Sequence, residues 1–319
     1  MVNTSNIFAV YCDGGICNRL NALIAAKVLA KKLNKVLTVY WPINTWCGLD
    51  YYSIFNHEEN IHAYDSSMLD LNLEYSDRFT LFAHEQQLFS FPLISNPNLI
   101  RKCDDLCQII INALEYKSVL YFNSVIPYCI PLDQASFFAK NLPFLTNYPV
   151  RANEFVTTYC LASNIPWSIH LRGTDFGFTK SYYDFWYFFA RHFPSLLLLM
   201  TDDLALKNRF SKLPNVRMRS FQDYPTKLDP DLDWVEDVID SYGRKFSFNI
   251  QRSGASVKES LIDLFILSQS KLILNSNSTF LVFAMLIRGY KFSLISYCYL
   301  NYRRLRQLIK ILSNNGLNS

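Results

Sequence analysis

Hydrophobic residues near the start of the chain follow two different periods, one typical of strands and one typical of a helix. IFAVYC at 7–12 and VLTVYW at 36–41 are apolar runs that predict buried strands. Between them, apolar residues of 17–34 recur at helical spacing after the turn at 13–15. The pattern therefore predicts a β-α-β unit whose helix connects two parallel strands.

The second half of the chain repeats this alternation several times. Its apolar runs predict strands at 166–172, 196–203, 215–219, 271–275 and 291–296. Helical spacing predicts helices at 181–193, 205–213, 256–270 and 278–289. Alternation of this kind is typical of an α/β fold with a mostly parallel, doubly wound sheet.

The middle of the chain is less regular. The pattern predicts strands at 79–83 and 119–123 and helices at 100–116 and 150–164, with clustered prolines between the second strand and the second helix. Together with the length of 319 residues, this indicates two domains, 1–150 and 151–319. The acidic stretch at 220–250 is interpreted as a solvated surface loop, with a lid over an acceptor as the alternative.

Composition narrows the class of protein. Half of the residues are hydrophobic, which excludes a disordered chain, and a net charge of +4 gives no indication of a nucleic-acid partner while allowing an anionic small ligand. The eight cysteines are spread without a CxxC motif, so we expect reduced, buried thiols. No signal peptide or membrane-spanning stretch is recognisable, so we expect a cytoplasmic protein without a transmembrane segment.

Polar residues follow the first predicted strand, where a parallel sheet binds its ligands. Gly14 and Gly15 allow backbone N–H groups and a helix N-terminus to approach an anion or a sugar, and Asn18 follows in the helix. The alternative is a tight strand-to-helix turn without a ligand. The sequence contains no GK[ST] motif, which argues against a P-loop nucleotidase.

A second polar cluster follows the strand at 166–172. His170 and Arg172 point to the same side of that strand, and Leu171 points into the opposite core. A guanidinium at a strand end can bind a diphosphate with two hydrogen bonds, and Asp175 is close enough in sequence to orient it. The alternative is a structural Arg–Asp pair in a loop.

Two further clusters follow later strands. Asp202 and Asp203 could bind sugar or base hydroxyls or cap the next helix, and Ser276, Ser278 and Thr279 could bind phosphate oxygens or cap theirs. Adjacent residues on a strand end point to opposite sides and no third ligand accompanies the two acids, so we predict no metal site.

These segments, taken in order, resemble the GT-B fucosyltransferase superfamily, which includes α-1,6- and α-1,2-fucosyltransferases and protein O-fucosyltransferases. The resemblance runs through GGICNRLNALIAAKVLAKKLNKVLTVYWP, IHLRGTD, LLLLMTDD and VKESLIDLFILSQSKLILNSNSTF, about a third of the chain. It implies two Rossmann-like domains facing a cleft, with the acceptor on 1–150 and the nucleotide sugar on 151–319. It also implies metal-independent, inverting transfer of fucose from GDP-fucose to a glycan or protein hydroxyl, with no cofactor.

The resemblance assigns roles to individual residues. Arg172 matches the arginine that contacts the donor diphosphate and assists departure of GDP, and Asp263 matches an acid that contacts guanine. Asn18 matches a polar residue near the sugar or acceptor. The other matching residues lie at the donor or flank these positions: Gly14, Gly15, His170, Asp175, Asp202, Asp203, Ser276, Ser278 and Thr279.

The sequence also departs from the family pattern. Gly173 stands where some relatives have a second arginine, and Cys17 stands where relatives usually have glycine. The general base stays open among Asp13, Asp175 and Asp202. A transferase using another GDP- or UDP-sugar, and a non-catalytic protein that binds a nucleotide sugar or a glycan, are the alternatives.

Overall fold

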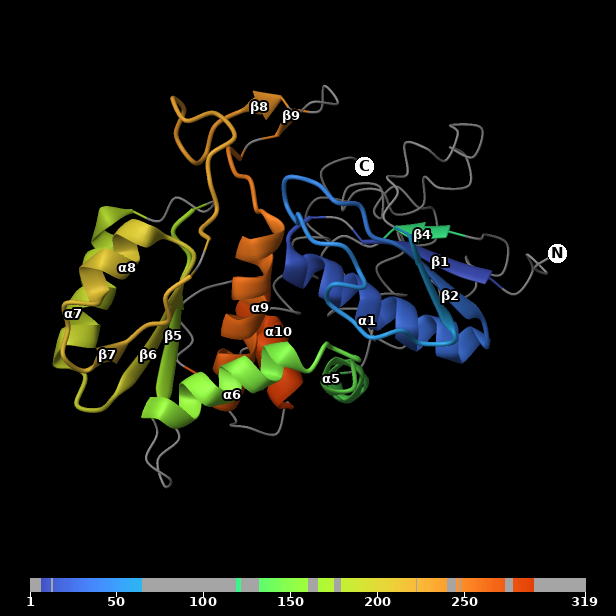
Figure 1. Cartoon of the computed structure of the whole chain (residues 1–319), viewed down its shortest axis with the longest axis horizontal. Helices are drawn as coiled ribbons and strands as arrows, with labels where there is room; N and C mark the ends of the chain where they lie inside the picture. Colours follow the sequence, from blue (N-terminus) through green and yellow to red (C-terminus); the bar gives the residue numbers. More distant parts are fainter. Residues whose placement is uncertain are drawn as a thin grey trace, which may run out of the picture. The chain divides into compact units, whose positions relative to one another are not determined.

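The structure is a computed structural model of the whole chain (Figure 1). It describes residues 7–12, 14–64, 119–121, 132–159, 166–174, 179–221, 223–239, 245–246, 248–272 and 278–289. The chain forms two compact units, the first of residues 1–43, 50–144 and 285–319 and the second of residues 44–49 and 145–284. The chain therefore passes between the units more than once, whereas the sequence indicated a single boundary.

The first unit contains the predicted β-α-β motif. Strand β1 (Ile7–Tyr11) and strand β2 (Val36–Tyr40) are parallel and are connected by helix α1 (Ile16–Leu33), which confirms the prediction. The helix ends at Asn34, whose left-handed backbone (φ 51°) lets the next N–H, that of Lys35, donate to the Ala30 carbonyl at 2.9 Å. The described part of this unit also includes β3 (Ile61–Tyr64), β4 (Val119–Tyr121) and α5 (Leu132–Lys140).

The second unit contains another four-stranded parallel sheet, with strands β5, β6, β7 and β10. Their bounds are β5 (Trp167–Leu171), β6 (Leu197–Thr201), β7 (Val216–Arg217) and β10 (Lys271–Leu272). Its helices are α6 (Asn147–Tyr159), α7 (Lys180–His192), α8 (Leu204–Phe210) and α9 (Gly254–Gln269). Helix α10 (Thr279–Arg288) begins in this unit, and its residues from 285 onward belong to the first. A short antiparallel pair, β8 (Val238–Ile239) and β9 (Lys245–Phe246), lies in the stretch predicted to be irregular.

Both sheets have the same strand order. The first is β3-β2-β1-β4 and the second is β7-β6-β5-β10, so each follows the order third, second, first, fourth along the chain. This is the order of the first four strands of a Rossmann sheet, and it reverses direction next to the first strand. The described sheets thus confirm a parallel α/β fold, and the placement of the two units around a cleft stays a prediction.

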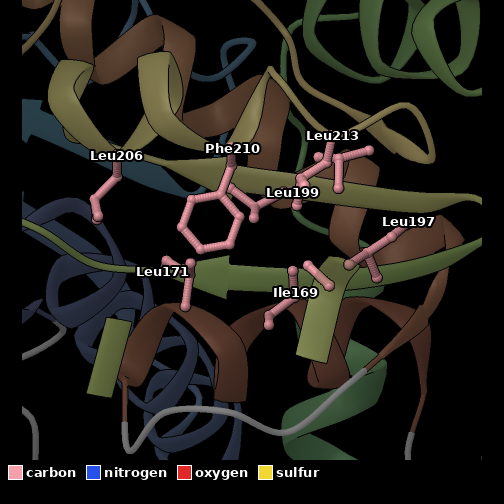
Figure 2. Close-up of a cluster of buried hydrophobic side chains, with 9 residues drawn as sticks. Ile169, Leu171, Leu197, Leu199, Leu206, Phe210 and Leu213 are labelled. Atoms are coloured by element: carbon pink, nitrogen blue, oxygen red, sulfur yellow. The ribbon is translucent and has the colours of Figure 1, made fainter. Parts of the chain in front are cut away.

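Alternating residues divide strand β5 between two environments. Ile169 and Leu171 lie in an apolar cluster with residues of β6 and α8 (Figure 2). Ser168 and His170 point to the opposite face, where the Ser270 hydroxyl donates to the Ser168 hydroxyl at 2.5 Å. The predicted opposition of His170 and Leu171 is therefore confirmed, and it places His170 on the α9 and α10 face of the sheet.

Several boundaries differ from the predicted ones for local physical reasons. Helix α6 begins at Asn147 rather than at residue 150, because Pro149 is tolerated in a first turn where its missing N–H would have no helical partner. Helix α9 begins at Gly254, since the Ser253 hydroxyl accepts the Ser256 N–H and caps it. The predicted elements at 79–83, 100–116 and 291–296 lie outside the described residues.

Residues 44–49 belong to the second unit through backbone pairing with the segment before α9. The Arg252 N–H donates to the Thr45 carbonyl at 2.8 Å, and the Gly48 N–H donates to the Arg252 carbonyl at 2.9 Å. A Cβ on Gly48 would lie 2.6 Å from that carbonyl oxygen, so only glycine fits this approach. The pairing thus binds both the N–H and the carbonyl of Arg252 to the segment 44–49.

The described residues bear on two further expectations. Cys12, Cys17 and Cys47 are buried and form no disulfide, as predicted for the cysteines. No helix within the described part of the chain is both long enough and apolar enough to cross a membrane.

Candidate functional site

The carboxyl ends of the two sheets hold the predicted clusters. In sheets with this strand order, ligands bind beyond the carboxyl ends where the order reverses. That point lies between β1 and β4 in the first unit and between β5 and β10 in the second. The glycine turn follows β1, and the cluster that begins at His170 ends β5, so the topology places both at reversal points.

Asp202 is the centre of the polar network at the end of β6. Its Oδ1 accepts the Gly173 N–H at 3.0 Å, and its Oδ2 accepts the Thr174 hydroxyl at 2.7 Å. Arg252 donates from Nη2 to the same Oδ2 at 2.9 Å. The carboxylate thereby connects the ends of β5 and β6 to the segment before α9.

The charge of Asp202 is strongly stabilised. Burial would raise the pKa of this carboxyl, but the positive charges of Arg252 and Arg172, together with the Gly173 N–H, hold its pKa well below the usual range. The residue is therefore an ionised anchor at any pH near neutrality. A general base needs a pKa near the working pH, so Asp202 is a poor candidate for that role.

The peptide group that joins Arg172 to Gly173 is held by two hydrogen bonds. Its carbonyl accepts the Tyr183 hydroxyl at 2.8 Å, and the next N–H, that of Gly173, is bound by Asp202. The half-buried Arg172 side chain therefore starts from a fixed position at the carboxyl end of β5. The structure brings Arg172 and Asp202 together, whereas Asp175 lies outside the described residues.

Asp203 has a different partner from Asp202. Its Oδ1 accepts the Leu206 N–H at 2.8 Å and so caps α8, which is the alternative that the sequence left open. Burial raises its pKa. A Cβ on Gly173 would lie 2.3 Å from the Asp203 Cβ, so position 173 cannot hold the second arginine of some relatives. Within the described residues, no three His, Cys, Asp or Glu side chains gather in a way that could hold a metal ion.

The start of α10 lies against His170. The rings of His170 and Phe280 stack with centroids 4.8 Å apart. The Ser278 hydroxyl accepts the Phe280 N–H at 3.1 Å, so Ser278 caps the helix that begins at Thr279. The structure thus brings Ser278 and Thr279 to the same end of the sheet as His170, while Ser276 lies outside the described residues.

Asp263 lies in a buried ion network on α9. Arg219, which follows β7, donates from Nε at 3.0 Å and from Nη2 at 2.9 Å to Oδ1 of Asp263. The same guanidinium pairs with Glu259, one turn earlier on α9. Burial raises the pKa of Asp263 to about 6, against the opposing effect of Arg219. Two acids at i and i+4 therefore share one arginine.

Sequence reasoning missed Arg219, Arg252 and Thr174. Arg219 ends the predicted strand at 215–219 and stands two residues after β7, so its place at a strand end was a usable signal. Arg252 had no such signal, because it follows no described strand and its acidic partner is 50 residues away. Thr174 was quoted only as part of a motif.

The glycine turn of the first unit is held by Arg19. This buried side chain donates from Nε to the Gly14 carbonyl at 2.7 Å and from Nη1 to the Pro42 carbonyl at 2.6 Å. Its guanidinium also lies over the Trp41 ring. Gly14 has φ 80°, which favours glycine. Arg19 is therefore structural, and it connects the turn to the end of β2.

Gly15 and Asn18 lie at the start of α1. Gly15 has φ −68°, and a Cβ there would meet nothing within 4 Å, so neither its backbone nor its neighbours require glycine. Such an open helix start suits a close ligand. Cys17 lies inside the helix, where no positive φ is needed, so a cysteine at this position does not strain the backbone of the turn. Asp13 lies outside the described residues.

Comparison with known proteins gives a match of structure only. No family model matches the sequence, and no curated protein matches it. The fucosyltransferase NodZ from Bradyrhizobium matches with a TM-score of 0.55 and 12% identity over 88% of this chain and 93% of that one. NodZ α-1,6-fucosyltransferase co-crystallised with GDP matches with a TM-score of 0.53 and 13% identity, over 88% of this chain and 92% of that one.

A plant enzyme matches equally well. A mutant of Arabidopsis thaliana FUT1 in complex with GDP gives a TM-score of 0.54 and 14% identity, over 89% of this chain and 68% of that one. Sequence identity this low shows the fold and no more. The chain therefore has the fold of the fucosyltransferases that its sequence resembles.

Proposed function

We propose that the protein is a glycosyltransferase that transfers fucose from GDP-fucose to a hydroxyl of a glycan or protein, without a metal and with inversion. The observation that carries this proposal is the fixed position of Arg172 beside Asp202, at the strand end where the sheet order reverses. The shared fold with a fucosyltransferase crystallised with GDP supports it.

The donor is assigned to the second unit. Arg172, Asp202, Asp263 and Ser278 all belong to residues 145–284. A guanidinium after β5 suits the diphosphate, and the first N–H groups of α10 suit its remaining oxygens. Asp263 suits guanine, because Arg219 occupies only its Oδ1 in the described residues and a carboxylate has further lone pairs for the N–H donors of the base edge. We assign the acceptor to the domain of residues 1–150.

The reaction follows from these positions. The acceptor oxygen attacks the anomeric carbon of fucose, the bond from that carbon to the phosphate oxygen breaks, and GDP leaves with the electron pair. Arg172 offsets the charge that grows on the diphosphate. The acceptor proton passes to a base, for which Asp13 and Asp175 stay candidates, because the low pKa of Asp202 makes it unsuitable.

The first prediction concerns the base of the donor. Isothermal titration calorimetry with GDP, UDP and ADP should show the tightest binding for GDP, because only guanine offers adjacent N–H donors to the Asp263 carboxylate. Equal or tighter binding of UDP would contradict the GDP assignment and leave the fold unaffected. It would favour a transferase of another nucleotide sugar.

The second prediction concerns pH. Because the pKa of Asp263 is raised to about 6, the residue is a neutral acid below that pH and a carboxylate above it. GDP affinity should therefore fall as the pH drops through about 6. The same titration on Asp263→Asn is the control, because protonation of GDP itself affects the affinity of both proteins equally. A constant ratio of the two affinities across this range would exclude Asp263 from the guanine site.

The third prediction concerns metal ions. Asp202 is bound to Gly173, Thr174 and Arg252, and Asp203 caps α8, so a cation would have to displace existing partners. Turnover of GDP-fucose should survive EDTA. A strict requirement for Mn²⁺ or Mg²⁺ would overturn the proposed mechanism and reassign the two acids as metal ligands.

The fourth prediction concerns Arg172. Arg172→Lys and Arg172→Ala should keep melting midpoints near wild type, yet lose about 10²–10³ in kcat, as when one donor of a preorganised anion site is removed. GDP affinity should fall less than the rate, because the interaction matters most in the transition state. Arg172→Ala with more than about a tenth of wild-type turnover, a loss of ~1.4 kcal/mol, would make Arg172 structural.

A further inference from the structure

We propose that Arg252 is a positioning residue of the diphosphate site, which holds Asp202 and through it sets the position of Arg172. This inference rests on the proposed function. It assigns a role to a residue that lies outside every motif found in the sequence.

The geometry of Arg252 is fixed at both ends. Its backbone N–H and carbonyl both pair with the segment 44–49. Its side chain is 10% exposed, and Nη2 donates to Oδ2 of Asp202 at 2.9 Å and to the Thr174 hydroxyl at 3.3 Å. A guanidinium held in this way has little freedom to move when a ligand binds.

The charges around Asp202 explain what Arg252 does. Two guanidiniums, those of Arg172 and Arg252, act on one buried carboxylate, so the three groups together carry a net charge of one positive unit. Removal of Arg252 would leave this carboxylate buried without its directly bonded cation. Asp202 would then attract Arg172 more strongly and compete with a diphosphate for it.

The shape of the turn explains why this arginine comes from a distant segment. Position 173 follows Arg172 directly, but its side-chain direction is filled by the Asp203 Cβ at 2.3 Å. A second guanidinium therefore cannot come from the turn itself. Arg252, in the segment before α9, supplies a guanidinium that donates to the hydroxyl of Thr174, the residue after Gly173.

The experiment compares Arg252→Met, Arg252→Lys and a control, Arg209→Met. Arg209 also pairs with an aspartate, Asp184 at 2.5 Å, but on the half-exposed surface of α7 and α8. For GDP-fucose turnover, Arg252→Met should lower kcat by about tenfold or more and change KM less, because it disturbs a group that acts in the transition state. Arg252→Lys should recover part of this loss, and Arg209→Met should match wild type.

A double-mutant cycle separates positioning from general stability. If Arg252 acts through Arg172, then Arg172→Ala with Arg252→Met should lose no more kcat than Arg172→Ala alone. Additive losses, or a kcat of Arg252→Met close to wild type, would overturn the inference. If Arg252→Met does not fold, Arg252→Lys supports the same cycle, since it keeps the charge but not the fork of donors.

A second readout needs no turnover. The ¹⁵N NMR signal of the Arg172 side chain, assigned by its loss in Arg172→Lys, should shift in Arg252→Met and stay unchanged in Arg209→Met. An unchanged signal in both variants would overturn the inference. Wild-type protein that binds no GDP in calorimetry would refute the proposed function, and the NMR comparison would still decide whether Arg252 positions Arg172.

Discussion

The architecture of the second unit depends on one buried carboxylate. A charged group removed from water must be paired and hydrogen-bonded, or it destabilises the fold. Asp202 meets this requirement with a backbone N–H, a hydroxyl and a guanidinium from Gly173, Thr174 and Arg252. Because these donors come from two distant segments, the end of β6, the turn after β5 and the start of α9 have to keep one arrangement.

Helix α9 shows the same constraint a second time. Near its start it is connected to β6 through Arg252 and Asp202, and two turns later Glu259 and Asp263 bind Arg219 at the end of β7. Its remaining buried residues are mostly apolar, and apolar contacts have no preferred direction. The two ionic connections are directional, so they fix the helix relative to the ends of β6 and β7. The site therefore gains its precision from polar groups on an apolar scaffold.

Much of this could be predicted from local sequence patterns. The β-α-β motif at the start of the chain and the alternation of His170 and Leu171 follow from spacing, and both were found as expected. The placement of polar clusters at strand ends followed from the order of the elements. These features depend on residues that are close in the sequence, so the local hydrophobic pattern is enough to predict them.

The partners of the charged residues could not be predicted in the same way. Asp202 and Asp203 are adjacent and chemically identical, yet one binds Arg252 and the other caps α8. Arg219 and Asp263 are 44 residues apart. Which acid meets which base depends on how strands pair and how far each helix extends, and no local window of sequence includes both partners.

The pairing of residues 44–49 with the segment before α9 has a consequence for folding during synthesis. Thr45 leaves the ribosome about 200 residues before Arg252, its hydrogen-bonding partner. During that interval the early segment cannot form these hydrogen bonds, because the chain between the two partners is still being made. The second unit is therefore complete only when the early segment pairs with the segment before α9. Expression of residues 145–284 alone would leave the N–H and the carbonyl of Arg252 without these partners.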